Sequence, residues 1–94
     1  MINPKTIKVV YPEYLRILRT TTLNNGEVSY SGKVLERRTD PKVATTITKT
    51  HTVVEDSLLL GLEREEVKDL VIKYIEGLKK AFLQEVHSTE EEFF

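Results

Sequence analysis

The chain has 94 residues, no cysteine, and 14 basic against 15 acidic side chains, which give a net charge of −1. These values exclude disulfide bonds, thiolate metal sites and cysteine nucleophiles, and they disfavour both a strongly basic nucleic-acid-binding protein and an acidic mimic of nucleic acid. No apolar run approaches the roughly 20 residues of a membrane-spanning helix. We therefore expect one domain over residues 1–94, located in the cytoplasm of a cell or of an infected host cell, without membrane contact.

Residues 1–60 are predicted to form an antiparallel sheet. Thr6–Tyr11 alternates as a strand does, and Pro12 interrupts it because proline cannot donate to a strand ladder. The segment that follows leaves two alternatives open, a short helix that begins at Pro12 or a strand that runs to Leu23. The β-branched run Thr20–Thr22 favours the strand.

Asn25-Gly26 is a typical signal for a tight hairpin turn, because both residues tolerate a positive φ. A two-residue loop here would place Arg19 opposite Gly32 and Leu15 opposite Glu36. The predicted core face then carries Leu15, Ile17, Leu23, Val28, Tyr30 and Val34. The predicted exposed face carries serine and threonine hydroxyls together with Leu18, Leu35 and three cations, Arg16, Lys33 and Arg37.

Asp40-Pro41 predicts a second turn, and Lys42–Val54 alternates as a further strand. Its odd-numbered side holds His51, which we interpret as a partly buried strand residue. Its other side holds a row of threonines, which are good residues for an exposed strand. These segments together predict a meander of three or four strands.

Residues 61–87 are predicted to form one long helix, from Glu63 to His87, with acidic residues in its first turn. The fold class is therefore α+β, with the helix packed across the sheet. The apolar stripe of this helix contains Val67, Leu70, Val71, Tyr74, Ile75, Leu78, Ala81 and Phe82. Ile72, Leu83 and Val86 extend the stripe on one flank, which a small sheet cannot cover. We expect these three residues to form an interface between identical copies, most simply in a two-fold dimer.

The inventory of reactive residues predicts no enzyme, no metal and no cofactor. The two histidines, His51 and His87, lack metal-ligand spacing, and no glycine-framed nucleophile or phosphate-binding loop is present. The charge is unevenly distributed, with a surplus of three positive charges over residues 1–60. A face with Arg16, Lys33 and Arg37 could follow a phosphate backbone, although it lacks the aromatic side chains on which bases stack.

Residues 88–94 form a tail with three consecutive acidic residues, Glu90, Glu91 and Glu92, followed by two aromatic residues, Phe93 and Phe94. This ending resembles the C-termini of single-stranded DNA-binding proteins of bacteria and some phages, although it lacks their aspartate-rich stretch and penultimate proline. The resemblance covers five residues and implies a tail that binds protein partners. The alternative is that the two phenylalanines cover apolar surface.

These observations together predict a non-enzymatic, self-associating interaction or adaptor protein, of a kind found among small viral or phage components. Its expected partners are a second copy of itself and another protein. The alternative is a single-stranded nucleic-acid-binding protein that uses the basic sheet face and the acidic tail.

Overall fold

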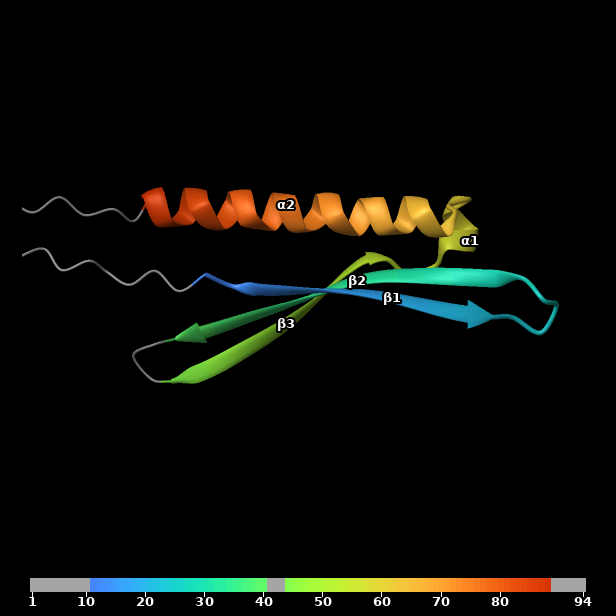
Figure 1. Ribbon diagram of the computed structural model, residues 1–94, viewed down its shortest axis with the longest axis horizontal. Coiled ribbons are helices and arrows are strands. Elements are labelled where there is room, and N and C mark those ends of the chain that lie inside the picture. Colours follow the sequence, from blue (N-terminus) through green and yellow to red (C-terminus); the bar gives the residue numbers. More distant parts are fainter. Residues whose placement is uncertain (1–10, 41–43, 89–94) are drawn as a thin grey trace, which may run out of the picture.

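The computed structural model describes residues 11–40 and 44–88, with side chains described as far as Gln84. These residues form β1 (Glu13–Thr22), β2 (Val28–Asp40), β3 (Thr45–Val54), α1 (Ser57–Leu60) and α2 (Arg64–Ser88). The strands make an antiparallel meander in the order β1-β2-β3, and α2 lies along one face of it (Figure 1). The predicted α+β class, the strand after Pro12 and the long helix are confirmed. The predicted strand Thr6–Tyr11 falls almost wholly outside the described residues.

The turn between β1 and β2 lies where it was predicted, but its loop has three residues instead of two. Leu23 and Glu27 close the loop, because the Leu23 amide donates to the Glu27 carbonyl oxygen at 2.7 Å. The Gly26 amide donates to the Leu23 carbonyl at 3.0 Å, and Gly26 alone in this loop has a positive φ, of 88°. This is a type I turn followed by a left-handed glycine, the common three-residue hairpin loop.

The extra loop residue changes the partner of every residue in β1. Leu15 lies opposite Leu35, whereas the sequence had predicted Glu36 as its partner. Gly32 lies opposite Leu18, whereas the sequence had predicted Arg19. A shift of one residue moves a strand's side chains to the other face of the sheet. The predicted assignment of Leu15 and Ile17 to the core was therefore wrong, and both are exposed, at 48% and 39% of their surface.

The face of the sheet beneath α2, which we call the covered face, holds the core. Val34 of β2 is fully buried against Val71 and Ile75 of α2, and Tyr14, Val53 and Leu78 pack around them. The helix can approach closely because β2 has a glycine, Gly32, directly below Val67 and Val71. The buried positions of α2 follow the predicted helical stripe, although Leu70 and Tyr74 at its margin are more than one-third exposed.

The end of the β2–β3 hairpin turns away from α2, so that it projects as a two-stranded arm (Figure 1). All described residues of the arm, 37–40 and 44–50, are exposed. At the other end of the β2–β3 pairing, the register shifts between Gly32 and Lys33 of β2, as in a β-bulge.

The short helix α1, which follows β3 after two residues, was not predicted from the sequence. Asp56 caps its N-terminus by accepting from the Leu58 amide at 3.0 Å, and Gly61 ends it with a left-handed φ of 65°. The buried Ser57 hydroxyl accepts from the Tyr30 amide at 2.8 Å. These contacts fix the connection between the sheet and α2.

Candidate interaction site

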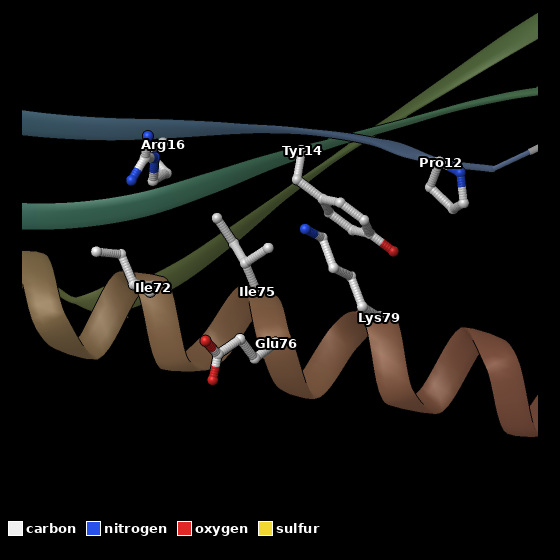
Figure 2. Close-up of a pocket in the computed structure, with 7 residues that line it drawn as sticks. All are labelled: Pro12, Tyr14, Arg16, Ile72, Ile75, Glu76 and Lys79. Carbon is white, nitrogen blue, oxygen red and sulfur yellow. The ribbon is translucent and has the colours of Figure 1, made fainter.

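A groove runs between β1 and α2, and we call it the edge groove. It consists of two adjoining hollows of about 500 and about 320 Å³, and both contain Arg16 of β1 and Ile72 of α2. Figure 2 shows Ile72 and Ile75 pointing from α2 toward the strands and Lys79 extending toward Tyr14. The other lining residues of the two hollows are Pro12, Ile17, Leu18, Arg64, Lys68, Val71 and Glu76.

The edge groove has an apolar floor and a charged rim. Ile72 is 37% exposed within it, and its neighbours one helical turn away are Lys68 and Glu76. Arg16 and Lys79 add positive charge near Glu76. The rim therefore offers both signs of charge beside an apolar side chain, which is typical of a surface that contacts protein.

The outer edge of β1 pairs with no strand of the described residues, because β2 is the only strand beside β1 in that part of the chain. Because the Leu23 amide points to β2, alternation along an antiparallel strand directs the amides of residues 14, 16, 18, 20 and 22 outward. An exposed edge of this length is a template for pairing with another strand.

A second feature is a buried polar cluster beneath α2. The Glu36 carboxylate, on a residue only 6% exposed, accepts from Nε2 of His51 and from Nε of Arg38, each at 2.8 Å. Since His51 uses its Nε2 proton for Glu36, its Nδ1 accepts from the Tyr74 hydroxyl at 2.9 Å. The cluster ties β2, β3 and α2 together with charge-assisted hydrogen bonds.

The electrostatics of this cluster affect two of its residues in opposite directions. Burial acts to raise the pKa of Glu36, but the hydrogen bonds from His51 and Arg38 outweigh it and lower that pKa below its ordinary value. Burial, followed by the nearby Glu36 charge, raises the pKa of Tyr14, whose hydroxyl is buried without a hydrogen-bond partner. Glu36 is therefore a carboxylate held ionised, and Tyr14 a phenol held neutral.

The cluster is separate from the edge groove, and its hydrogen bonds join parts of the fold to one another. Both ring nitrogens of His51 are occupied, and neither hollow of the edge groove is lined by Glu36, His51 or Tyr74. In the part of the chain that the structure describes, no three histidine or acidic side chains converge as metal ligands would. The sequence had suggested a partly buried His51, and this is confirmed.

The structure separates the three cations predicted to share one exposed face. Lys33 and Arg37 lie on the face away from α2, which we call the open face, but Arg16 lies in the edge groove on the covered side. The shifted register places Arg19 on the open face in its stead, opposite Ser31. The prediction that Arg16 accompanies Lys33 and Arg37 was therefore wrong.

The predicted helix flank is partly within the described residues. Ile72 and Leu83 are exposed, at 37% and 44%, and Ile72 lines the edge groove. The side chain of Val86 and the tail Glu90–Phe94 lie outside the description, so the roles predicted for them stay predictions. The Glu36–His51 contact was missed, because the sequence did not give the register of β2 against β3. The sequence does contain a signal for this contact. Glu36 lies two residues after the core residue Val34, and therefore on the same face of the strand, and the neighbouring strand carries a histidine.

No protein family, no curated protein and no solved structure matches this chain. Within the described residues, neither helix combines the length and the apolar character needed to cross a bilayer. The edge groove, the open face and the polar cluster are therefore the features of the molecule that bear on its function.

Proposed function

We propose that this chain is a non-enzymatic interaction protein that self-associates through the edge groove. In the proposed dimer, β1 pairs antiparallel with β1 of a second copy, and the two sheets become one. The observation that supports this most directly is the juxtaposition of an open strand edge with an exposed apolar side chain, Ile72, on the adjacent helix.

The spacing of the elements permits such a dimer. α2 packs over β2, where Val67 and Val71 close over Gly32, and this position leaves the outer edge of β1 accessible to another strand. Pairing of the two β1 strands would put the two β2 strands three strand spacings apart, or roughly 14 Å. Helices are about 10–12 Å wide with their side chains, so two copies of α2 would fit side by side on one face of the joined sheet.

The charges on α2 are complementary in this arrangement. A two-fold axis that passes Ile72 makes the two helices antiparallel and places Lys68 of each copy beside Glu76 of the other. The two Arg16 side chains would approach each other near the axis, but each shares its groove with Glu76. A second copy thus satisfies both the strand edge and the charged rim, as a self-complementary surface must.

The mass of the protein in solution tests the proposal. Light scattering at high micromolar concentration should give twice the monomer mass of 10.9 kDa. Ile72→Glu should shift the protein toward the monomer, because it buries a charge at the axis. Leu70→Glu is a matched control, since Leu70 is equally exposed, at 38%, but points to the other side of α2. A monomeric unmodified protein, or equal effects of both changes, would contradict the proposed interface.

A charge exchange tests the orientation of the helices. Lys68→Glu alone should weaken the dimer by placing like charges beside Glu76 of the other copy. Addition of Glu76→Lys should restore it, because the pair is then reversed rather than removed. A double variant no more dimeric than Lys68→Glu would show that Lys68 and Glu76 of the two copies do not meet.

Leu83 lies farther along the same flank of α2. Leu83→Asp should weaken association while leaving helix content intact.

The proposal of a non-enzymatic role is supported by the occupied hydrogen-bonding positions of the buried cluster. The alternative function, binding of single-stranded nucleic acid, is supported by the position of Arg19, Lys33 and Arg37 on one open face. Against this alternative, none of the other described side chains on the open face is aromatic, and single-stranded nucleic acid is usually bound by stacking of its bases on aromatic rings.

A further inference from the structure

The open face carries an apolar centre that α2 cannot reach, because the helix lies on the other side of the sheet. Leu15 and Leu35 lie opposite each other on β1 and β2, and Ile17 is the next residue on that face. Leu15 and Ile17 remain 48% and 39% exposed. Three contiguous aliphatic side chains in water favour contact with another apolar surface.

Cations lie at both ends of this apolar centre. Lys33 is the cross-strand partner of Ile17, and Arg19 lies one position farther along the same face of β1. At the other end, Arg37 lies opposite Glu13, with Nη1 3.7 Å from the carboxylate oxygen. The other described residues beside them on β3 are threonines 46, 48, 50 and 52. The described part of this face is therefore positively charged around an apolar strip.

This combination distinguishes between possible occupants. A second copy would bring the same cations against each other, and like charges at close range oppose stacking of two open faces. A phosphate backbone would satisfy the cations but leave Leu15, Ile17 and Leu35 in water. An anionic bilayer is usually bound with aromatic side chains at the interface, and the described residues of this face include none.

We propose that the open face is a docking surface for an acidic amphipathic helix of a partner protein. Apolar residues of that helix would cover Leu15, Ile17 and Leu35, and glutamate or aspartate residues on its flanks would pair with Arg19, Lys33 and Arg37. The bound partner would form a third layer, so that the sheet has one helix of its own on the covered face and one foreign helix on the open face. Ile17 also lines the edge groove, so the two surfaces adjoin along β1.

A pair of synthetic peptides tests the charge and the apolar character together. The first peptide has leucines at positions i, i+3, i+4 and i+7 and glutamates on the flanks of the stripe, and the second has lysines in place of the glutamates. Fluorescence anisotropy with the full-length protein should show binding of the glutamate peptide at least about tenfold tighter than binding of the lysine peptide. Equal affinities, or no binding of the glutamate peptide, would overturn the proposal.

Matched variants locate the contact. The double change Leu15→Ser with Ile17→Ser, and separately Arg19→Ala with Lys33→Ala, should each weaken peptide binding about tenfold or more. Ile47→Ser should leave it unchanged, because Ile47 is a more exposed aliphatic residue on the opposite face of the sheet. Circular dichroism and light scattering on each variant separate loss of docking from loss of fold or of the dimer. Unaltered peptide binding in both double variants would contradict the assignment to this face. So would tighter binding of oligothymidylate or anionic phospholipid vesicles that depends on the same residues.

Discussion

Gly32 of β2 lies so close beneath Val71 of α2 that a β-carbon at position 32 would stand 2.7 Å from Cγ2 of Val71. Cγ1 of Val67 would be 2.8 Å away, so the two valines close over the glycine from both sides. Real β-carbons do not approach other atoms so closely, and branched side chains on a helix have little freedom to move aside. The position of α2 over β2 therefore depends on the absence of a side chain at residue 32.

Replacement of this glycine by alanine should destabilise the protein. We expect Gly32→Ala to lower the free energy of unfolding by about 1–3 kcal/mol, because the helix must shift or the valines must leave their rotamers. Gly77→Ala in α2 is the control, since a β-carbon there meets nothing within 4 Å. That change should stabilise the helix by roughly 0.5–1 kcal/mol. Urea denaturation measures both, and an unaffected Gly32→Ala protein would show that α2 does not pack this tightly.

Glu36 should make stability depend on pH in the acid range. Its pKa is lower in the folded protein than in the unfolded chain, so its ionised form stabilises the fold at neutral pH. This contribution is present above the ordinary glutamate pKa of about 4.3 and is lost as the pH falls through the lower folded value. Glu36→Gln should cost about 1.5–3 kcal/mol at pH 7, where charged hydrogen bonds are lost.

The difference between the unmodified protein and Glu36→Gln should shrink as the solution is acidified below the ordinary pKa. Asp56, whose pKa is also lowered, first by the Ser29 hydroxyl and then by the Leu58 amide, is present in both proteins and cancels in the comparison. Urea denaturation at several pH values measures the difference. A constant difference from neutral to acid pH would mean that Glu36 is not held ionised by His51 and Arg38.

Gly26 should be required for the first hairpin because of its backbone conformation alone. Its φ of 88° is strained for residues with a side chain, and a β-carbon there would meet no atom within 4 Å. We expect Gly26→Val to lower the free energy of unfolding by roughly 1 kcal/mol or more, as β-branched residues resist this region. Gly26→Asn should cost less, because asparagine tolerates a positive φ. Equal thermal midpoints for the two variants would argue against this loop.

The alternative of nucleic-acid binding makes a prediction about which arginine matters. If the open face follows a phosphate backbone, oligonucleotide affinity should fall with salt with a logarithmic slope of about −2 for three contacts. The triple change of Arg19, Lys33 and Arg37 to alanine should remove that dependence, and Arg16→Ala should have little effect. Anisotropy titrations from ~50 mM salt upward decide the point. An absence of binding at the lowest salt concentration would exclude this function.

The sequence predicts the helices and strands of this fold better than it predicts the register between the strands. The spacing of Val67, Val71 and Ile75 identifies the buried side of α2, because a helix presents one face at a fixed period. Asn25-Gly26 marks the first turn but does not distinguish a two-residue from a three-residue loop. That single residue decides whether Leu15 faces the core or the solvent.

The candidate sites depend on the register between the strands and were therefore predicted only in part. Ile72 was recognisable as an uncovered flank from helical geometry alone. The separation of Arg16 from Lys33, and its replacement by Arg19, follow from the loop length, which local sequence leaves open. The contact of Glu36 with His51 also requires the register of β2 against β3, including the irregularity at Gly32. By contrast, Asp56 and Gly61 are ordinary cap signals from which α1 could have been predicted.

The order of elements along the chain also constrains how the protein is made. The sheet is complete at Val54, but the side chains that cover it begin at Val67. During synthesis, Val34 therefore remains in water until residues as far as Ile75 have emerged from the ribosome. Hairpins that have no covering layer are only marginally stable in water, so the nascent strands should form and dissolve repeatedly. In that interval the edge of β1 and both faces of the sheet are open together, and a chaperone that shields extended apolar segments would find its binding sites there.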